Sequence, residues 1–593
     1  MVATDSRIMA ESVAALTYRD STLLKNGRPH RMLAGAVHYF RVHPDQWEDR
    51  LRRLAAMGAN TVDTYIAWNF HEETEGEPRF DGWRDVERFI RLAGTVGLDV
   101  YVRPSPYICA EWSNGGLPTW LTRRTRSVRS SDPVYREAVA AWYAELLPRL
   151  VPLQAAHGGP IVAVQVENEY GSFGSDREHL EHQRDLIREY GITELLTTAD
   201  GITAGMQAHG SVGGAMPSFT FGTGVATAVQ LLPAATPLLC SELWGGWFDH
   251  WGERHHVRSA ASMISTVDEL LAAGGSVSLY MAHGGTNFGL WNGANWDGVL
   301  QPTATSYDSD APIAEDGRVG AKFEALRASF APFHDKPLPE LPSAPLFQAP
   351  QSVRLTAEAS LISAVRALAA GPMRANPATF EELGVSEGIV AYETTAELHG
   401  ETVMAIKGLH DRATVFLDGE RIATLDRDGD TSTVLNAGAD HDSVRIAVIT
   451  IVVENLGRIN YGPKIGEHKG ILDGVLLGRR YAHGWTHRVL PLADLQPAGT
   501  PGTDGYAVAE INVAEAADAW LAFPGGVKGM VWVNGFLIGR YWNVGPQVTL
   551  YAPAPLWRAG RNEVRVLDLD QLGTTVDVRD QAELGEVEEF IGA

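Results

Sequence analysis

Eight short apolar runs, separated by segments of helical period, occupy the first 335 residues of the chain. They read RMLAGAVHYF, NTVDTYIAW, LDVYVRPSP, PIVAVQVENE, LLTTAD, SFTFG, PLLCSELWGG and SVSLYMAHGG. Alternation of strand-length and helix-length segments is typical of βα units in a parallel sheet. Since eight such units close into a barrel, the sequence predicts a (β/α)8 TIM barrel over residues 1–335.

A long helix is predicted to begin at the pair Asp132 and Pro133. Asp132 and Pro133 combine a side chain suited to the N-cap with a proline suited to the first helical turn. Trp142 and Leu146 then continue the helix with apolar residues on one face. We expect Pro148 to end or kink the helix, because a proline inside a helix removes a backbone hydrogen bond.

A proline-dense segment follows the predicted barrel. Its sequence, PFHDKPLPELPSAPLFQAP, can neither continue a helix nor lie inside a sheet, so we assign residues 336–352 to a linker. Beyond it, VFLDGERIATL and VWVNGFLIGRY each centre on Asp-Gly or Asn-Gly, which suits a type I′ turn between antiparallel strands. We predict two all-β domains of the jelly-roll or sandwich type, over residues 353–490 and 491–593.

The charge of the chain restricts its partners. Its net charge of -24 comes from acidic residues scattered along the sequence, which repel nucleic acid and anionic membranes. No run approaches the roughly 20 apolar residues of a membrane helix. The segment MVATDSRIMAESVAALTYRD lacks the basic start of an export signal, and only two cysteines occur. These features predict a cytoplasmic protein without nucleic-acid or membrane partners.

Carboxylates follow two of the predicted strands. The run from Ile161 to Val166 leads into Glu167, Asn168 and Glu169, and the run PLLCSE ends in Glu242. These would be the fourth and seventh barrel strands, whose carboxyl ends face each other across the mouth where barrels carry active sites. Two carboxyl groups that flank one bond suit glycoside hydrolysis. The alternative is that the acids at such strand ends form structural salt bridges.

Other strand ends carry polar and aromatic residues. Glu111 follows the third predicted strand, and Tyr65 follows the second. Trp244, two residues beyond Glu242, is the better candidate for a wall that packs against the apolar face of a sugar. We expect Trp247 and Trp251 to be largely structural.

The sequence predicts no metal site and no cofactor. The acidic segment DRDGD, from Asp426, lacks the glycine and glutamate positions of an EF-hand loop. His255 and His256 are adjacent, whereas two ligands on one helical face need a spacing such as HExxH.

Several ordered motifs together carry a family resemblance. They are GAVHYFRV, DTYIAWNFHE, RPSPYICAEW, QVENEYG, SELWGGWFDHWG, HGGTNFG, NYGPKIGEHKGI and NGFLIGRYWNVGPQ. These segments resemble glycoside hydrolase family 35, the β-galactosidases, over nearly the whole chain. Where that family often reads TSYDYDAP, this chain has TSYDSDAP, with Ser309 in place of the second tyrosine.

The resemblance implies a role for each matching residue. Glu169 would be the acid/base, Glu242 the nucleophile and Asn168 a sugar ligand. The further substrate-binding residues would be Tyr65, Cys109, Ala110, Glu111, Trp244, Tyr307 and Tyr461. Glu167 is the weaker candidate for catalysis, because neighbouring strand side chains alternate in direction.

The resemblance also implies an activity, that of a retaining exo-β-galactosidase acting on β-galactoside oligosaccharides, with a β-1,3 preference and a homodimeric assembly. The last domain resembles a galactose-binding jelly roll, and we expect the β-domains to brace the barrel. Two alternatives remain at this point: an exo-β-glucosaminidase of the same family, and a carbohydrate-binding protein without catalysis.

Overall fold

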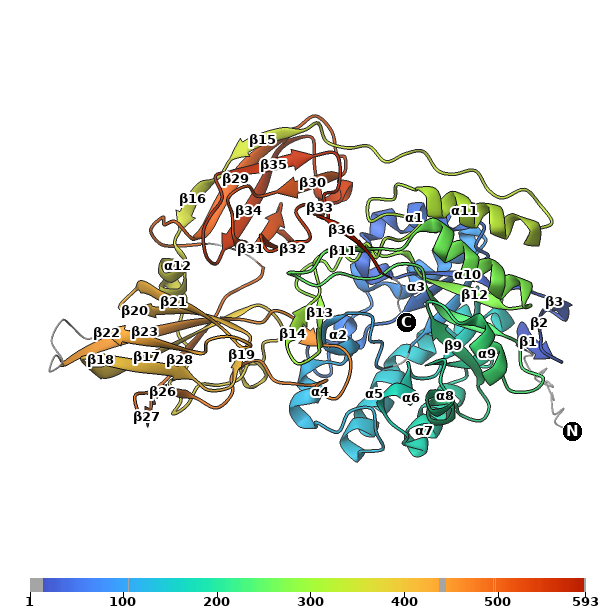
Figure 1. Cartoon of the computed structure of the whole chain (residues 1–593), viewed down its shortest axis with the longest axis horizontal. Helices are drawn as coiled ribbons and strands as arrows, with labels where there is room; N and C mark the ends of the chain where they lie inside the picture. Colours follow the sequence, from blue (N-terminus) through green and yellow to red (C-terminus); the bar gives the residue numbers. More distant parts are fainter. Residues whose placement is uncertain (1–13, 105, 437–443, 494, 496, 591–593) are drawn as a thin grey trace, which may run out of the picture.

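The computed structural model describes residues 14–104, 106–436, 444–493, 495 and 497–590, which form a barrel followed by two all-β domains (Figure 1). The barrel consists of eight parallel strands that close on themselves. In order along the chain they are β4 (Leu33–Val37), β5 (Thr61–Tyr65), β6 (Asp99–Arg103), β7 (Ile161–Gln165), β8 (Leu195–Gly201), β9 (Met216–Phe221), β10 (Leu239–Trp244) and β12 (Ser276–His283). Six strands fall within their apolar runs, while β8 extends one residue past LLTTAD and β9 begins two residues before SFTFG, so the predicted TIM barrel is confirmed.

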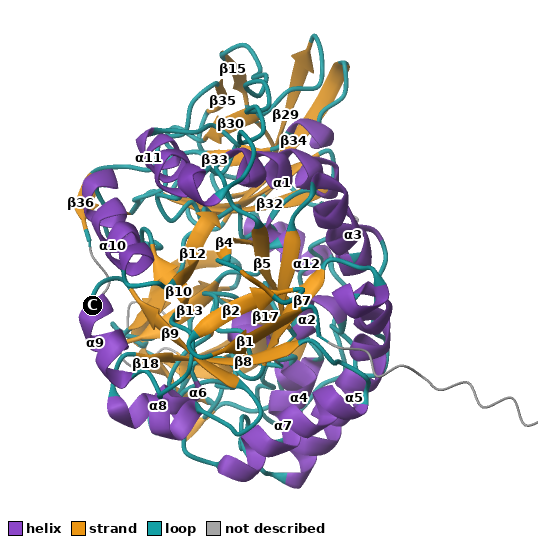
Figure 2. Cartoon of the chain, turned by 90° about the vertical axis from the view of Figure 1, so that its right-hand side faces the viewer, coloured by secondary structure: helices purple, strands orange, loops and turns teal. Residues whose placement is uncertain are grey.

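Helices surround the barrel, as Figure 2 shows. The main ones are α1 (Trp47–Ala56), α3 (Val86–Val96), α5 (Pro133–Leu150), α7 (Arg177–Glu189), α8 (Ala204–Gly210), α9 (Val225–Leu231), α10 (Ala260–Ala272) and α11 (Ala321–Phe330). The Asp132 side chain accepts hydrogen bonds from the backbone N–H groups of Val134 and Tyr135, as expected of an N-cap. Helix α5 continues for two residues past Pro148, which therefore lies in its last turn.

Each all-β domain contains two antiparallel sheets, and the predicted fold class is confirmed. The first domain has β17 (Ile389–His399), β20 (Arg412–Leu417), β21 (Glu420–Asp426), β23 (Val444–Glu454) and β28 (Thr486–Val489) in one sheet, and β18 (Glu401–Ile406), β22 (Ser432–Asn436), β26 (Val475–Leu477) and β27 (Arg480–Tyr481) in the other. In the last domain one sheet has β16 (Thr356–Ala359), β29 (Gly505–Val513), β31 (Lys528–Val533), β32 (Phe536–Trp542) and β34 (Gly560–Asp568), and the other has β15 (Gln351–Arg354), β30 (Ala519–Ala522), β33 (Leu550–Ala552) and β35 (Thr575–Arg579).

Both predicted tight turns occur between paired strands. Asp418 and Gly419 join β20 to β21, and Asn534 and Gly535 join β31 to β32. All four residues have positive φ, between 50° and 98°, which is the backbone conformation of a type I′ turn.

The chain after the linker departs from the predicted boundary at residue 353. The linker crosses the molecule as an extended segment from α11 to β15 (Figure 1). Strand β15 pairs with β35, and β16 pairs with β29, so both belong to the last domain. Strand signals are local, and nothing near residues 351–359 shows that their partners lie more than 140 residues further along the chain.

Two loops at the barrel mouth pair with the β-domains. Strand β13 (Gly293–Trp296) pairs with β24 (Arg458–Ile459) of the first all-β domain. Strand β11 (His255–Val257) pairs in parallel with β36 (Val587–Glu589), near the end of the described chain. The barrel mouth is therefore built from three parts of the sequence. Across the described residues, no helix is both long and apolar enough to cross a membrane.

Candidate active site

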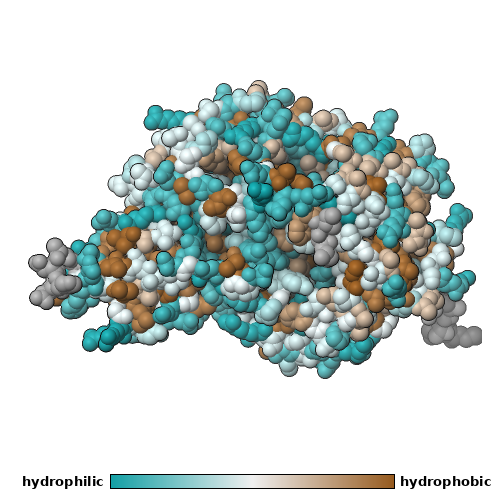
Figure 3. All heavy atoms as spheres, in the orientation of Figure 1, coloured by the Kyte–Doolittle hydropathy of each residue, from teal (hydrophilic) through white to brown (hydrophobic). Residues whose placement is uncertain are grey.

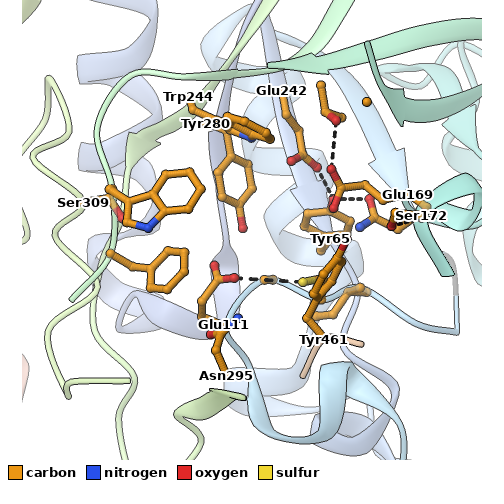
Figure 4. Close-up of a pocket in the computed structure, with 18 of the residues that line it drawn as sticks. Tyr65, Glu111, Glu169, Ser172, Glu242, Trp244, Tyr280, Asn295, Ser309 and Tyr461 are labelled. Carbon is orange, nitrogen blue, oxygen red and sulfur yellow. Dashed lines mark hydrogen bonds between the residues drawn. The ribbon is translucent and has the colours of Figure 1, made fainter. Parts of the chain in front are cut away.

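A cavity of about 470 Å³ opens at the carboxyl ends of the barrel strands (Figure 4). It is lined by all ten residues that the sequence assigned to the site: Tyr65, Cys109, Ala110, Glu111, Asn168, Glu169, Glu242, Trp244, Tyr307 and Tyr461. Ser309, which stands where the related family often has tyrosine, also lines it. A volume of this size is typical of a site for a small ligand.

Glu242 lies on β10 and is 5% exposed. Its Oε1 lies 2.5 Å from the Tyr65 hydroxyl and accepts a hydrogen bond of 2.8 Å from Nη1 of Arg103. Arg103 also binds Asp63 through two guanidinium nitrogens, so its position is fixed by the barrel interior. Burial raises the pKa of Glu242, and the Arg103 charge and the hydrogen bond from Tyr65 oppose that rise. The pKa of Glu242 stays above its ordinary value, and the Arg103 cation is the contact that favours its ionised form.

Glu169 follows β7 and has a left-handed backbone, with φ of 48°. This conformation turns the chain into the short helix α6 (Tyr170–Phe173) while the carboxyl group faces the cavity. Thr220, on β9, donates a hydrogen bond of 2.8 Å to Oε1 of Glu169. Burial, together with the negative charge of Glu242, raises the pKa of Glu169 to about 7.

The two carboxyl groups therefore have different surroundings. An arginine side chain donates directly to Glu242, whereas the hydrogen bond to Glu169 comes from the uncharged hydroxyl of Thr220. Two neighbouring carboxyl groups resist being ionised at the same time. The proton is therefore held by Glu169, which has no cation bound to it, rather than by Glu242, which is bound to Arg103. With a pKa of about 7, Glu169 is the group that keeps a proton towards neutral pH, and Glu242, beside Arg103, is the one that ionises; these are the forms that a general acid and a nucleophile require.

Glu167 has a structural role. Arg129 donates to both of its carboxylate oxygens, at 3.0 and 2.7 Å, and Nε2 of His179 lies 3.1 Å from Oε1. Burial alone would raise the pKa of Glu167, but Arg129 and His179 outweigh it and lower the pKa to about 2. The structural salt bridge that the sequence left open as an alternative is therefore present at Glu167.

Asn168 connects Glu167 to the site. Its backbone N–H donates to the Glu167 carboxylate at 2.6 Å, and its side-chain oxygen lies 2.6 Å from the Tyr65 hydroxyl. Gln165 holds the same oxygen at 3.0 Å, which leaves the Asn168 amide group available to a ligand.

The opposite side of the cavity carries Glu111. Cys109, Ala110 and Glu111 all have positive φ, at 53°, 55° and 46°, and this tight bend directs the Glu111 carboxyl group into the cavity. The Tyr307 hydroxyl donates to Glu111. The guanidinium carbon of Arg41 lies 3.7 Å from the centre of the Tyr307 ring, and Arg41 also donates to the carbonyl of Ala110. Burial raises the pKa of Glu111.

Aromatic rings close one wall of the cavity. The Trp247 ring centre lies 5.5 Å from that of Trp244 and 5.0 Å from that of Phe248, and all three residues line the cavity. The expectation that Trp247 is structural is therefore wrong. Trp251 does pack away from the cavity, against Trp542 of the last domain.

Tyr461 reaches the cavity from the first all-β domain. It follows Asn460, whose backbone carbonyl accepts a hydrogen bond of 2.6 Å from Tyr107 and whose N–H donates to Ala294 at 3.0 Å. These contacts hold the loop at the rim, on the same side as Glu169 and Ser172 (Figure 4).

Sequence reasoning missed several cavity residues. Thr220 is the penultimate residue of β9, so applying the strand-end argument to all eight runs would have found it, whereas Tyr280 lies in the interior of β12. Arg103 ends β6, and in the sequence it stands out only as the first residue of the motif RPSPYICAEW. In the described part of the chain, no group of three or more His, Cys, Asp and Glu side chains could hold a metal ion.

Comparison with known proteins gives three family matches. Residues 22–332 match "Glycosyl hydrolases family 35", residues 377–492 match "Beta-galactosidase, first all-beta domain", and residues 507–562 match "Beta-galactosidase, galactose-binding domain". The chain is 38% identical to a beta-galactosidase of Bos taurus, covering 94% of this chain and 90% of the relative. It is 35% identical to beta-galactosidase 17 of Arabidopsis thaliana, covering 93% and 87%. Among solved structures, a beta-galactosidase from Marinomonas ef1 is similar with a TM-score of 0.37 and 12% identity, covering 50% of this chain and 58% of that one.

Proposed function

Since the chain belongs to glycosyl hydrolase family 35, we propose that its barrel cavity removes galactose from β-galactosides by a retaining mechanism. The protein is an exo-β-galactosidase that releases terminal non-reducing β-D-galactose. The observation that carries the mechanism is the pair of cavity carboxyls with different surroundings: Glu242 is bound to Arg103, and Glu169 is bound to the uncharged Thr220 hydroxyl, with a pKa raised to about 7.

In the first step, Glu242 attacks the anomeric carbon of the bound galactose. The bond from that carbon to the aglycone oxygen breaks, and Glu169 gives its proton to the departing oxygen. Arg103 and Tyr65 hold the attacking carboxylate in place. The product of this step is a covalent galactosyl-enzyme in which the anomeric configuration is inverted.

In the second step, a water molecule takes the position of the aglycone. Glu169, now ionised, removes a proton from the water as the oxygen attacks the anomeric carbon and the bond to Glu242 breaks. The second inversion restores the β-configuration. A pKa of about 7 suits both tasks, because the same group must give and take a proton near neutral pH.

Substrate recognition falls to the polar groups around the two catalytic carboxyls. Glu111, Asn168 and Tyr65 present carboxylate, amide and hydroxyl groups to the cavity, which suits the hydroxyls of a galactose ring. The aromatic wall of Trp244 and Trp247 offers an apolar surface to the C–H face of the sugar.

The test of these roles replaces each carboxylate and supplies azide. In Glu242→Gly, azide occupies the place of the nucleophile and should give the α-galactosyl azide. In Glu169→Gly, a dinitrophenyl galactoside should still form the covalent intermediate, because its leaving group needs no proton, and azide should then give the β-galactosyl azide. The configuration of each product is read by NMR. The reverse pairing would contradict the assignment of acid and nucleophile.

The substrate class has its own test. The wild-type protein should hydrolyse p-nitrophenyl β-galactoside in preference to p-nitrophenyl β-glucosaminide. Turnover of the glucosaminide alone would favour an exo-glucosaminidase, and no turnover of any glycoside would favour a binding protein. We further propose a β-1,3 preference, on the family resemblance, and equal rates on β-1,3-, β-1,4- and β-1,6-galactobiose would contradict it.

We also propose a homodimeric, cytoplasmic protein. Dimerisation is supported by outward-facing apolar residues on the first all-β domain, where Val403 and Val434 pair across neighbouring strands at 52% and 47% exposure. Light scattering of the purified protein should give twice the chain mass. A cytoplasmic location is supported by the two cysteines, both buried and unpaired, and cell fractionation tests it.

A further inference from the structure

The outer side of the aromatic wall contacts a residue from the far end of the described chain. The ring of Phe590 lies 5.1 Å from the Trp247 ring and 5.0 Å from the ring of His256. Trp247 therefore lines the cavity and also contacts Phe590, although Trp247 and Phe590 are far apart in the sequence.

The backbone holds Phe590 at this position. Strand β36 pairs in parallel with β11, and the two strands share hydrogen bonds from His255 N–H to the Glu586 carbonyl and from Phe590 N–H to the Val257 carbonyl, each of 2.8 Å. Figure 1 shows β36 crossing from the last domain to lie beside β11.

The loop that carries Trp247 is fixed on its other side by the barrel. Arg258 donates to the carbonyl of Trp244 at 2.6 Å, and Lys322 donates to the carbonyl of Gly245 at 2.7 Å. Asp249 accepts hydrogen bonds of 2.8 Å from both the His255 ring and the His256 backbone, which ties the loop to β11. These bonds fix the backbone on either side of Trp247, while its ring is oriented by contacts with Trp244, Phe248 and Phe590.

We propose that Phe590 is a positioning residue for substrate binding, which holds the Trp247 ring as a wall of the cavity. The proposal rests on the function proposed above, because it assumes that the sugar packs against this wall. Phe590 does not line the cavity, and of its two ring neighbours, Trp247 and His256, Trp247 is the one that does. The segment that carries it would make the affinity of the barrel site depend on the last part of the chain.

The test compares Phe590→Ala with a matched control, Val587→Ala. Val587 lies on β36, three residues before Phe590, and is 61% exposed. A contact between two aromatic rings contributes enough to change an equilibrium constant about three- to tenfold. An apolar wall binds the substrate and the transition state equally well. In Phe590→Ala, KM for p-nitrophenyl β-galactoside should therefore rise about three- to tenfold, while kcat changes less than about twofold. Phe590→Tyr, which keeps the ring, should restore the wild-type KM.

A double substitution shows whether the effect passes through Trp247. Trp247→Ala alone should raise KM, and adding Phe590→Ala to it should raise KM no further. Additive effects, or a Phe590→Ala variant that behaves like Val587→Ala, would overturn the inference. Failure of the proposed function would look different, because the wild-type protein itself would then leave the galactoside intact.

Discussion

Replacing Thr220 by valine should extend the activity of the enzyme to higher pH. Thr220 is 1% exposed and donates a hydrogen bond of 2.8 Å to Glu169. Valine has nearly the same shape, so the change removes the donor and leaves the packing. A donated hydrogen bond favours the ionised carboxylate, and its loss must therefore raise the pKa of Glu169 above its value of about 7.

The size of the shift follows from the hydrogen bond. A bond to a charged group contributes about 1.5 to 3 kcal/mol and a bond between neutral groups about 0.5 to 1.5 kcal/mol. Removing the donor therefore costs the ionised form roughly 1 to 1.5 kcal/mol more than the protonated form, which corresponds to about one pKa unit.

The assay is the pH profile of kcat/KM on p-nitrophenyl β-galactoside. Activity requires protonated Glu169 and is lost as pH rises through its pKa, so the alkaline limb should move up by about one pH unit in Thr220→Val. Thr220→Ser keeps the hydroxyl donor and should leave the limb in place. An unchanged limb in Thr220→Val, or one that moves to lower pH, would refute the assignment of Glu169 as the acid held by Thr220.

Two further changes test other parts of the site. Glu167→Gln should lower the free energy of unfolding by about 3 to 5 kcal/mol at pH 7, because it leaves Arg129 buried without its partner. Because the folded-state pKa of Glu167 is about 2, below the unfolded value of about 4.3, this stabilisation is full at neutral pH and fades as pH falls towards 2. Urea titrations at several pH values should show the wild type and the variant converging in acid, and a constant difference would contradict the ion-pair explanation. Tyr461→Ala should raise KM for a galactobiose about three- to tenfold and leave KM for β-galactosyl fluoride unchanged, because Tyr461 lies on the side of Glu169, where the aglycone departs. An equal rise for both substrates would place Tyr461 against the galactose instead.

Much of the site can be predicted from the sequence, because a barrel brings residues at the ends of separate strands together at one rim. Each βα unit is recognised from a few neighbouring residues, and closure brings the carboxyl ends of all eight strands to one rim. Glu169 and Glu242 could therefore be paired without knowledge of any contact. The expected alternation of side chains does not separate Glu167 from Glu169, because residues two apart point to the same face of a strand and both lie beyond the end of β7, with positive φ.

Contacts that depend on the register between barrel strands, or on pairing with distant segments, cannot be predicted from a local sequence pattern. Thr220 faces Glu169 only because β9 and β7 have a particular stagger in the barrel, and threonine is common in strands. Trp247 stands in a tryptophan-rich run that reads equally well as core. The neighbouring Gly246 lets this loop pack against the backbone of Ser309, since a β-carbon there would meet the Ser309 carbonyl oxygen at 1.8 Å. The pairing of β15 with β35 is similarly invisible to any local pattern.

The way the domains join explains why the motifs of this family extend beyond the barrel. NYGPKIGEHKGI contains Tyr461, and its Asn460 is held by Tyr107 and Ala294 of the barrel. NGFLIGRYWNVGPQ contains Arg540, whose side chain donates to Glu454 at 2.8 Å and to Asn292 of the barrel at 3.2 Å. Asn292 directly precedes the strand that pairs with the segment before Tyr461. The last domain therefore fixes the loop through which the first all-β domain reaches the cavity, so a substitution far from the carboxylates can alter the site without touching the substrate.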